Sequence, residues 1–222
     1  MDSYWKLIEK GMFSEAFNRA AEEYKEYNDI RSLRQRASAS IMMNNYENAL
    51  ADYLKILDEI EERHKSDIDY IYVGVLYWLL GEYAKAIQMF IDSMTLKLPY
   101  TANIISPPAI VYFSSVYLND EKVKKESIKY LKKFANKKLP LALFLLNEIN
   151  EFQLLNTIAE DSPMKSRMLC KYELYIAVKY LENDDKLKFY EHLKKCIDTK
   201  KIIEFEYFIA LSELNKKAKI IE

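Results

Sequence analysis

The chain is poor in the residues that interrupt helices and turn strands: its 222 residues include 3 glycines and 5 prolines. A β-sheet protein needs turn residues about every 8 to 12 positions, and many of those turns use Gly or Pro. This scarcity argues against a large sheet and favours long helices. The hydrophobic fraction of 50% is that of a globular chain, and 18 tyrosines with 10 phenylalanines supply bulk for packing between helices.

Cysteine is also scarce, since Cys170 and Cys196 are the two in the chain. Two cysteines are too few for a disulfide framework and leave no second pair for a zinc site. We therefore expect free thiols, buried in helices, in a reducing compartment. A net charge of −1 and a pI of about 6.2 provide no broad basic field that would attract nucleic acid.

Targeting and membrane signals are missing as well. Residues 1–6 lack the basic and apolar regions of a signal peptide. The longest apolar run, residues 68–80, is interrupted by Asp69 and is shorter than the roughly 18 residues of a membrane span. These features predict a cytoplasmic protein.

Patterns that carry catalytic chemistry are absent too. His64 and His192 lie among charged residues and are expected on exposed helix surfaces. There is no His-Glu-x-x-His helix, glycine-rich phosphate loop or nucleophile elbow. The acidic clusters at residues 58–62 and 182–185 are expected to be solvated surface. We therefore predict no enzyme, no cofactor and no metal site.

An internal repeat is the strongest pattern present. Residues 70–93 read YIYVGVLYWLLGEYAKAIQMFIDS. A small residue, Gly74, stands where two helices would approach, and Gly81 marks the turn between them. The second helix then has small and aromatic residues at i, i+4 and i+7 spacing, namely Ala86, Phe90 and Ser93. With Tyr77 and Tyr83, this order resembles the tetratricopeptide repeat, a helix–turn–helix unit of about 34 residues.

The same frame recurs at other positions of the chain. Ala16 and Ala49 are equivalent to Ala86, at spacings of 49 − 16 = 33 and 86 − 49 = 37 residues. Ser127 is expected at the alanine position of a fourth repeat, and Phe189 replaces the small residue in the last one. The resemblance implies an all-α superhelix, a solenoid forming a single domain over residues 1–222. Its parts are well-matched repeats at 1–97, degenerate repeats at 107–201 and a capping helix at 202–222.

Two segments depart from this frame. Residues 140–160 form an apolar helical stretch without a repeat signature. Residues 98–106 are the longest irregular stretch and are expected to be either a joint between two halves or a binding loop. Ser106 is predicted to cap the next helix, with Pro107 and Pro108 in its first turn.

The resemblance also implies where a partner would bind. In tetratricopeptide proteins the first helix of each pair lines a concave groove. Carried over to this chain, the groove includes Trp5, Arg31, Arg34, Ile71, Val75, Trp78 and Tyr112. Such a wall suits an apolar or acidic peptide. Some family members clamp a terminal carboxylate, but the asparagine of that clamp is missing here. An Arg34→Glu variant is expected to fold and to lose its partner.

Three hypotheses for function remain open at this stage. The first is a protein-binding adaptor or regulator. The second is a bacterial immunity protein that neutralises a toxin, suggested by a stand-alone chain rich in Lys, Ile, Asn and Tyr. The third is an enzyme or RNA binder on a helical scaffold. A lysine-rich run at residues 122–138 is expected to surround most of the polar side of an outer helix, as solvated surface or as a contact for an acidic partner or RNA.

Overall fold

The computed structural model describes residues 3–61, 65–96 and 104–221, with side chains described as far as residue 217. Within these residues there are thirteen helices and no strand, so the predicted all-α class is confirmed. The chain divides into two units, Met1–Ala102 and Asn103–Glu222. That boundary falls in the stretch where a joint was expected, although residues 97–103 lie outside the described part, as does His64. One continuous domain over the whole chain stays a prediction.

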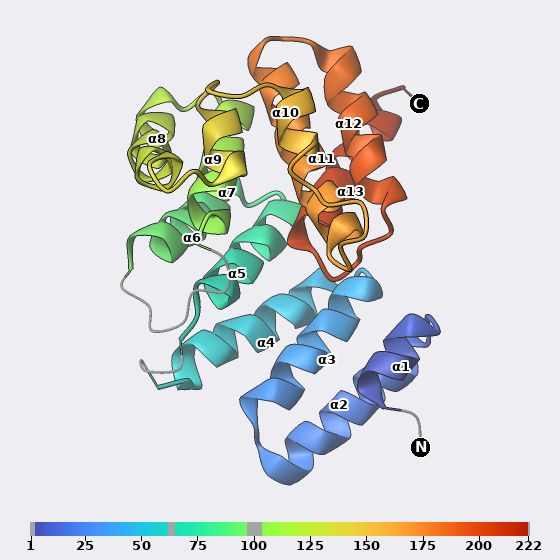
Figure 1. The fold of residues 1–222 in the computed structure, drawn as a ribbon. Coiled ribbons are helices and arrows are strands. Elements are labelled where there is room, and N and C mark those ends of the chain that lie inside the picture. The colour runs from blue at the N-terminus through green and yellow to red at the C-terminus, as the bar shows by residue number, and fades with distance from the viewer. Residues whose placement is uncertain (1–2, 62–64, 97–103, 222) are drawn as a thin grey trace. The chain divides into compact units, whose positions relative to one another are not determined.

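The N-terminal unit is a row of helices in which each helix packs on the next one in the sequence (Figure 1). The pairs α2 with α3, α4 with α5, and α5 with α6 illustrate this arrangement. Its helices are α1 (Tyr4–Glu9), α2 (Phe13–Tyr27), α3 (Ile30–Met42), α4 (Tyr46–Glu59), α5 (Asp67–Leu79) and α6 (Tyr83–Thr95).

The pair α5 and α6 shows why the repeat needs its small residues. A Cβ atom added to Gly74 would overlap the Phe90 ring and would lie 3.1 Å from the carbonyl oxygen of Ala86. Ala86 and Phe90 are themselves fully buried. Gly74 is therefore the point of closest approach, as predicted, and any larger residue there would separate the two helices.

One turn geometry recurs in both units. In each case a residue with positive φ follows the helix, and the next N–H bonds to the carbonyl five residues earlier, which is the Schellman motif. Glu82 N–H, after Gly81 (φ 79°), bonds to the Tyr77 carbonyl at 2.8 Å. Equivalent residues at other turns are Gly11, Asn44, Asn119, Lys138, Asn147 and Asp184. Asn and Asp tolerate this left-handed conformation better than other side chains, so they replace glycine at most of the other turns.

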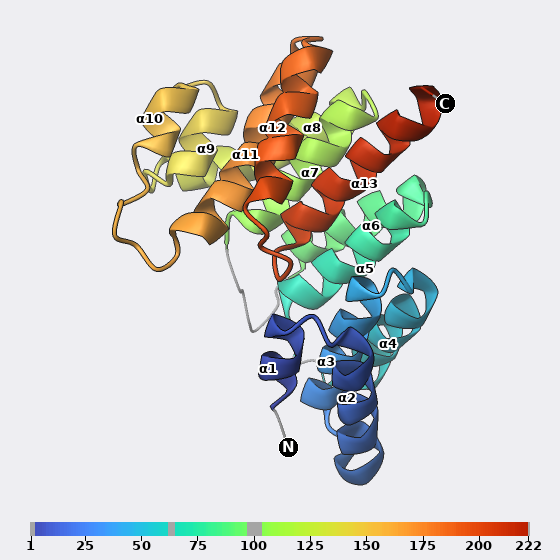
Figure 2. The ribbon, with the colours of Figure 1, turned by 90° about the vertical axis from the view of Figure 1, so that its right-hand side faces the viewer.

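The C-terminal unit is less regular. Its longest pair, α11 and α12, runs side by side, and α7 packs on both α8 and α11 (Figure 2). Its helices are α7 (Ser106–Tyr117), α8 (Glu121–Ala135), α9 (Pro140–Leu145), α10 (Glu151–Leu155), α11 (Lys165–Glu182), α12 (Lys186–Asp198) and α13 (Phe205–Ile221). Helix α13 packs on α11 and α12, in the place expected for a cap on this unit.

Several local predictions need correction in this unit. Ser106 lies inside the first turn of α7, and the capping position is Ile105, whose side chain makes no cap hydrogen bond. Ser127 is buried as expected. However, α8 starts 38 residues after α6, so the position equivalent to Ala86 is Lys124. The apolar stretch 140–160 forms two short helices, α9 and α10, because Asn147 turns the chain between them with φ 62°.

None of the helices in the described ranges combines the length and the apolar character that crossing a bilayer requires.

Candidate functional site

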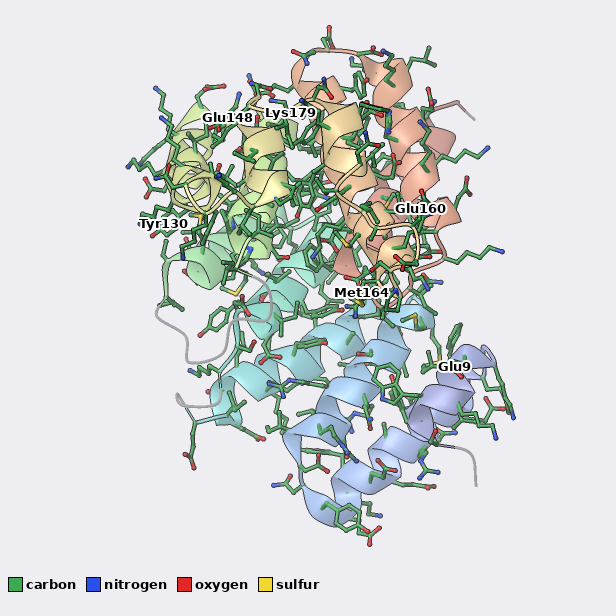
Figure 3. The ribbon with its side chains drawn as sticks, in the orientation of Figure 1. Glu9, Tyr130, Glu148, Glu160, Met164 and Lys179 are labelled. Atoms are coloured by element: carbon green, nitrogen blue, oxygen red, sulfur yellow. The ribbon has the colours of Figure 1, made fainter. Side chains whose placement is uncertain are left out.

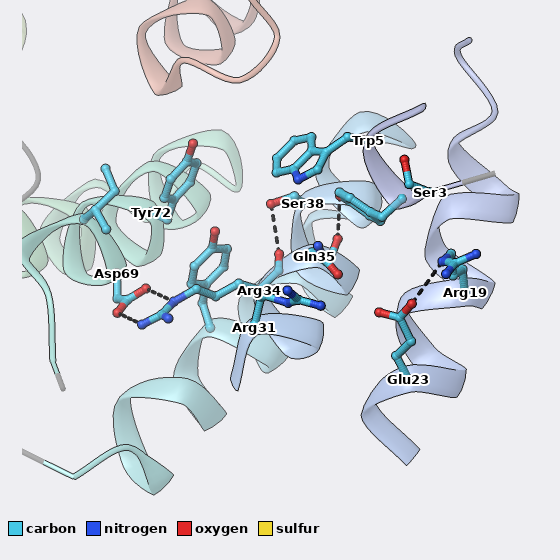
Figure 4. A pocket seen from close by; sticks show the side chains of 13 residues that line it. Ser3, Trp5, Arg19, Glu23, Arg31, Arg34, Gln35, Ser38, Asp69 and Tyr72 are labelled. Atoms are coloured by element: carbon cyan, nitrogen blue, oxygen red, sulfur yellow. Dashed lines mark hydrogen bonds and ion pairs between the residues drawn. The ribbon is translucent and has the colours of Figure 1, made fainter. Parts of the chain in front are cut away.

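The N-terminal unit contains an open pocket of about 500 Å³ between α1, α2, α3, α4 and α5 (Figure 4). Its walls are aromatic on one side and charged on the other. The lining residues are Ser3, Tyr4, Trp5, Arg19, Glu23, Arg31, Arg34, Gln35, Ser38, Tyr53, Ile68, Asp69 and Tyr72. The pocket collects residues from every repeat of this unit, although they are up to 69 positions apart in the sequence.

The charged wall centres on a bidentate ion pair. Arg34 on α3 donates from Nε and Nη2 to the two carboxylate oxygens of Asp69 on α5, at 2.8 and 2.6 Å. Asp69 is 1% exposed, so this carboxylate depends on its partner. The hydrogen bonds that Arg34 donates to Asp69 raise the pKa of Arg34 further, against the opposing effect of burial. Arg34 is thus first of all a structural link between two repeats.

Arg31 differs from its neighbour in this respect. It is exposed, one turn before Arg34, and no carboxylate among the described residues lies within ion-pair distance of its guanidinium. The other arginine of the pocket, Arg19, bonds to Glu23 at 3.0 Å. The lining residues therefore carry one excess positive charge, that of Arg31, which also attracts the carboxylate of Asp29 two residues earlier.

The aromatic wall is built from two pairs of rings. Tyr53 and Tyr72 stack with centroids 5.2 Å apart, and Tyr4 meets Trp5 edge to face at 5.1 Å. Burial raises the pKa of Tyr53 well above the ordinary value, so its hydroxyl stays protonated. Trp5 is 55% exposed at the rim (Figure 4). An indole left this open offers a large apolar contact surface with a hydrogen-bond donor.

The predicted partner-binding residues divide into two groups. Trp5, Arg31 and Arg34 come together in the pocket. The other four are buried packing residues, and a partner could not contact them in this structure: Ile71, Val75, Trp78 and Tyr112 have between 0 and 2% exposure. Trp78 packs on Tyr83 and Phe90, and Tyr112 belongs to the other unit, where its hydroxyl donates to Glu182 at 2.8 Å.

The error on α5 has a simple cause. The helix presents Ile68, Asp69 and Tyr72 to the pocket, and this set is centred about 100° around the helix axis from the residues predicted. A signal for the side that faces the pocket was present. Asp69 interrupts an apolar run 35 residues after Arg34, which is about one repeat length, and a lone charge in such a run needs an opposite charge nearby.

The C-terminal unit holds a second polar cluster, around a histidine that was expected at the surface. His192 is 3% exposed because its Nδ1 lies 2.6 Å from Glu173 and its ring stacks on Tyr180 at 5.1 Å. Nε2 lies 3.8 Å from Glu151, which also accepts the Tyr180 hydroxyl hydrogen bond at 3.0 Å. The prediction of an exposed His192 was wrong, because these carboxylates offset the cost of burying the ring.

This cluster does not form an open reaction centre. Glu151 and Tyr180 line a hollow of about 530 Å³, but His192 is not among the residues that line it. Within the described ranges, no group of three or more His, Cys, Asp or Glu side chains is arranged to hold a metal ion. The pocket of the N-terminal unit is therefore the better candidate for a functional site.

Comparison with known proteins yields likeness in structure and none in sequence. No family model matches the chain, and no curated protein matches it. The crystal structure of MamA is 12% identical, with 90% of this chain and 95% of that chain covered and a TM-score of 0.50.

A second solved structure is the C-terminal part of a TPR repeat-containing protein from Cytophaga hutchinsonii. It is 18% identical over 91% of this chain and 97% of its own, with a TM-score of 0.38, which is too low to support an argument. The likeness to MamA concerns the fold alone. Together with the repeated turns, it shows that the chain has a tetratricopeptide-like fold of paired helices.

Proposed function

We propose that this protein is a protein-binding module, an adaptor or regulator, whose N-terminal pocket receives a segment of a partner protein. The observation that carries the proposal is the position of Trp5 and Arg31. Both are exposed and both line the same pocket beside buried tyrosines. Trp and Arg are the residues that most often dominate binding energy at protein interfaces, above all when they border a preformed hollow.

The chemistry of the pocket favours a segment with an apolar or aromatic residue next to an acidic one. Tyr72, half-buried and stacked on the buried Tyr53, provides an apolar surface, and Arg31 provides a positive charge that no ion pair within the described residues neutralises. Arg34 has already committed two donors to Asp69. It contributes shape and its remaining N–H groups more than net charge.

We infer that the protein acts in the cytoplasm, because Cys170 and Cys196 are free, buried thiols of the kind that a reducing compartment maintains. Neutralisation of a toxin is a narrower form of the same function, since an inhibitor also works by holding another protein. The identity of the bound protein distinguishes these two roles.

The test is capture of partners by the full chain from an extract of the source organism, followed by mass spectrometry and titration of the captured protein. Three proteins are compared: the wild type, a Trp5→Ala/Arg31→Ala variant and a Phe152→Ala control. Phe152 is 72% exposed in the C-terminal unit, so the control also removes an exposed aromatic ring.

We expect one protein to bind the wild type and the control in fixed stoichiometry, and the double variant to bind it at least about 100-fold more weakly. A toxin domain among the captured proteins would indicate an immunity protein, and any other stable partner an adaptor. Equal capture by the double variant would refute the assignment of the pocket.

A further inference from the structure

The C-terminal unit has a strongly charged surface that the pocket does not explain. Helix α8 carries an unbroken set of exposed lysines, namely Lys122, Lys125, Lys129, Lys132 and Lys133. At 100° per residue these five positions fall within an arc of about 100°, and they extend over about 16 Å of the helix axis. The sequence-based expectation that lysines surround most of the polar side is therefore wrong for the exposed ones.

The opposite side of α8 explains why this stripe faces outward. Ser127, Leu131 and Ala135 are buried at i, i+4 and i+8, centred about 150° from the lysines, where α8 packs on α7 and α9. Lys124 lies on this inner side, and its ammonium reaches Glu182 on α11 at 2.7 Å. The lysines of the stripe instead point to solvent, and Figure 3 shows side chains that end in nitrogen projecting from α8.

Little of this charge is neutralised within the unit. Lys129 pairs with Glu126 at 2.6 Å, and Lys133 lies over the Tyr130 ring at 4.5 Å. Within the described residues, Lys122, Lys125 and Lys132 have no carboxylate within ion-pair distance. Residues 121–138 hold eight lysines and two glutamates, a net charge of +6, whereas the whole chain carries −1. The rest of the chain therefore carries −7.

We propose that the lysine stripe of α8 is a docking surface for an acidic segment of a partner protein. Charge complementarity identifies the occupant. An amphipathic helix with Asp or Glu at matching positions presents carboxylates to all five lysines over the same three turns. The surface belongs to a different unit from the pocket and goes beyond the binding function proposed for it.

Two features favour an acidic protein over a polyphosphate chain or an anionic membrane. The charge of −7 on the rest of the chain opposes approach to an extended polyanion, which senses the field of the whole protein. The stripe also contains no arginine, and its aromatic neighbour Tyr130 is half-buried beneath Lys133. It therefore offers no ring for stacking on bases and no apolar anchor for a bilayer.

The experiment measures binding of the full chain to three labelled probes by fluorescence anisotropy or co-sedimentation. The probes are a helical peptide of about 15 residues with glutamates at the five matching positions, single-stranded oligouridylate, and mixed vesicles of phosphatidylserine and phosphatidylcholine. A stripe variant, Lys125→Glu/Lys129→Glu/Lys132→Glu, is compared with a control, Lys25→Glu/Lys186→Glu/Lys194→Glu. The control makes the same change of charge at exposed positions of α2 and α12.

We expect the wild type and the control to bind the peptide, and the stripe variant to bind it at least about tenfold more weakly, because three attractions become repulsions. Added salt should weaken the wild-type complex. A peptide with the same composition but scattered glutamates should bind less well. Equal peptide binding by the stripe variant, or stripe-dependent binding of oligouridylate or vesicles in preference to the peptide, would overturn the proposal.

Discussion

The two units use their polar groups differently. In the N-terminal unit, ion pairs with the buried Asp52 and Asp69 join helices within and between repeats and leave an open pocket. Arg36 bonds to Asp52 between α3 and α4, with its Nε 2.9 Å from Oδ2, as Arg34 bonds to Asp69 between α3 and α5. In the C-terminal unit, polar groups form networks between helices: the buried His192 with Glu173, and the half-buried Glu182 with Tyr112 and Lys179.

The difference shows how each unit compensates for the repeat sequence. Regular hairpins with small contact residues pack closely, and the N-terminal unit leaves an open pocket between its helices. Where the repeat decays, the helices pack with larger residues such as Phe189, and buried polar networks fill the spaces between them. Burial raises the pKa of Glu182, but hydrogen bonds from Lys124 and Lys179 prevail and hold it below the ordinary value.

The largest expected effect comes from removing the ion pair between Arg34 and Asp69, which links two repeats. Arg34→Glu should lower the free energy of unfolding by about 4 kcal/mol, because it leaves the buried Asp69 carboxylate facing a second negative charge. This revises the expectation that the variant would fold normally. Arg31→Glu is the matched control and should change stability by less than about 0.5 kcal/mol. Urea titration of both proteins checks this; equal stabilities would show that the ion pair has no structural role.

Overpacking the closest helix contact should have the next largest effect. Ala86→Leu adds three heavy atoms beside Gly74 and Phe90, where no space remains, and should destabilise the protein by about 2 kcal/mol. Ala84→Leu makes the same change at an exposed neighbouring position and should be nearly neutral. Thermal unfolding distinguishes them. An unchanged melting temperature for Ala86→Leu would contradict the repeat frame.

The buried polar interior of the C-terminal unit predicts a pH dependence that the N-terminal pocket does not. Glu206 on α13 is fully buried, its oxygens lack a hydrogen-bond partner, and Lys171 Nζ lies 3.9 Å away. Burial raises the pKa of Glu206 to about 7, aided by the charge of Glu204 and opposed by those of Lys171 and Arg167. Nearby Tyr175 and Cys196 are neutral, since burial raises the pKa of both.

The direction in which stability changes with pH follows from proton binding by Glu206. Between the ordinary carboxyl pKa and about 7, the folded state holds a proton that the unfolded state has lost. The contribution of Glu206 to stability is therefore complete at low pH and is lost as pH rises through 7. Glu206→Gln should be about 1 to 2 kcal/mol more stable than the wild type near pH 8 and equal to it near pH 4.5. Chemical denaturation across this range tests it, with exposed Glu148→Gln as control; parallel curves for wild type and Glu206→Gln would contradict it.

The smallest expected changes in stability come from substitutions in the turns between helices. Gly81→Asn and Asn119→Gly exchange residues between equivalent turns, at φ 79° and 55° respectively. We expect a loss of about 0.5 to 1 kcal/mol for the first change and a gain of a few tenths for the second, because glycine adopts positive φ without strain. High-precision denaturant curves measure both. Losses of several kcal/mol in either turn would mean that side chains, not the backbone, determine its geometry.

Much of the N-terminal unit could be predicted from its sequence. Gly74, Ala86 and Phe90 identified the α5–α6 pair, and Trp5, Arg31 and Arg34 identified part of the pocket lining. The inner face of α5 was misplaced because periodicity alone does not fix the rotation of a helix that is apolar nearly all round. Burial of His192 was missed because its partner, Glu173, is 19 residues away on another helix. Local charge patterns cannot show a contact of that kind.

The recurring Schellman turn has a consequence for how such a chain can change over time. Its geometry depends on backbone hydrogen bonds and on one residue that tolerates positive φ, and Gly11, Asn44, Gly81, Asn119 and Asp184 all meet that condition. A turn geometry that depends on main-chain hydrogen bonds constrains the identity of few side chains. Substitutions can accumulate between the turns while the path of the chain persists, so ancestry can fade from the sequence long before it fades from the fold.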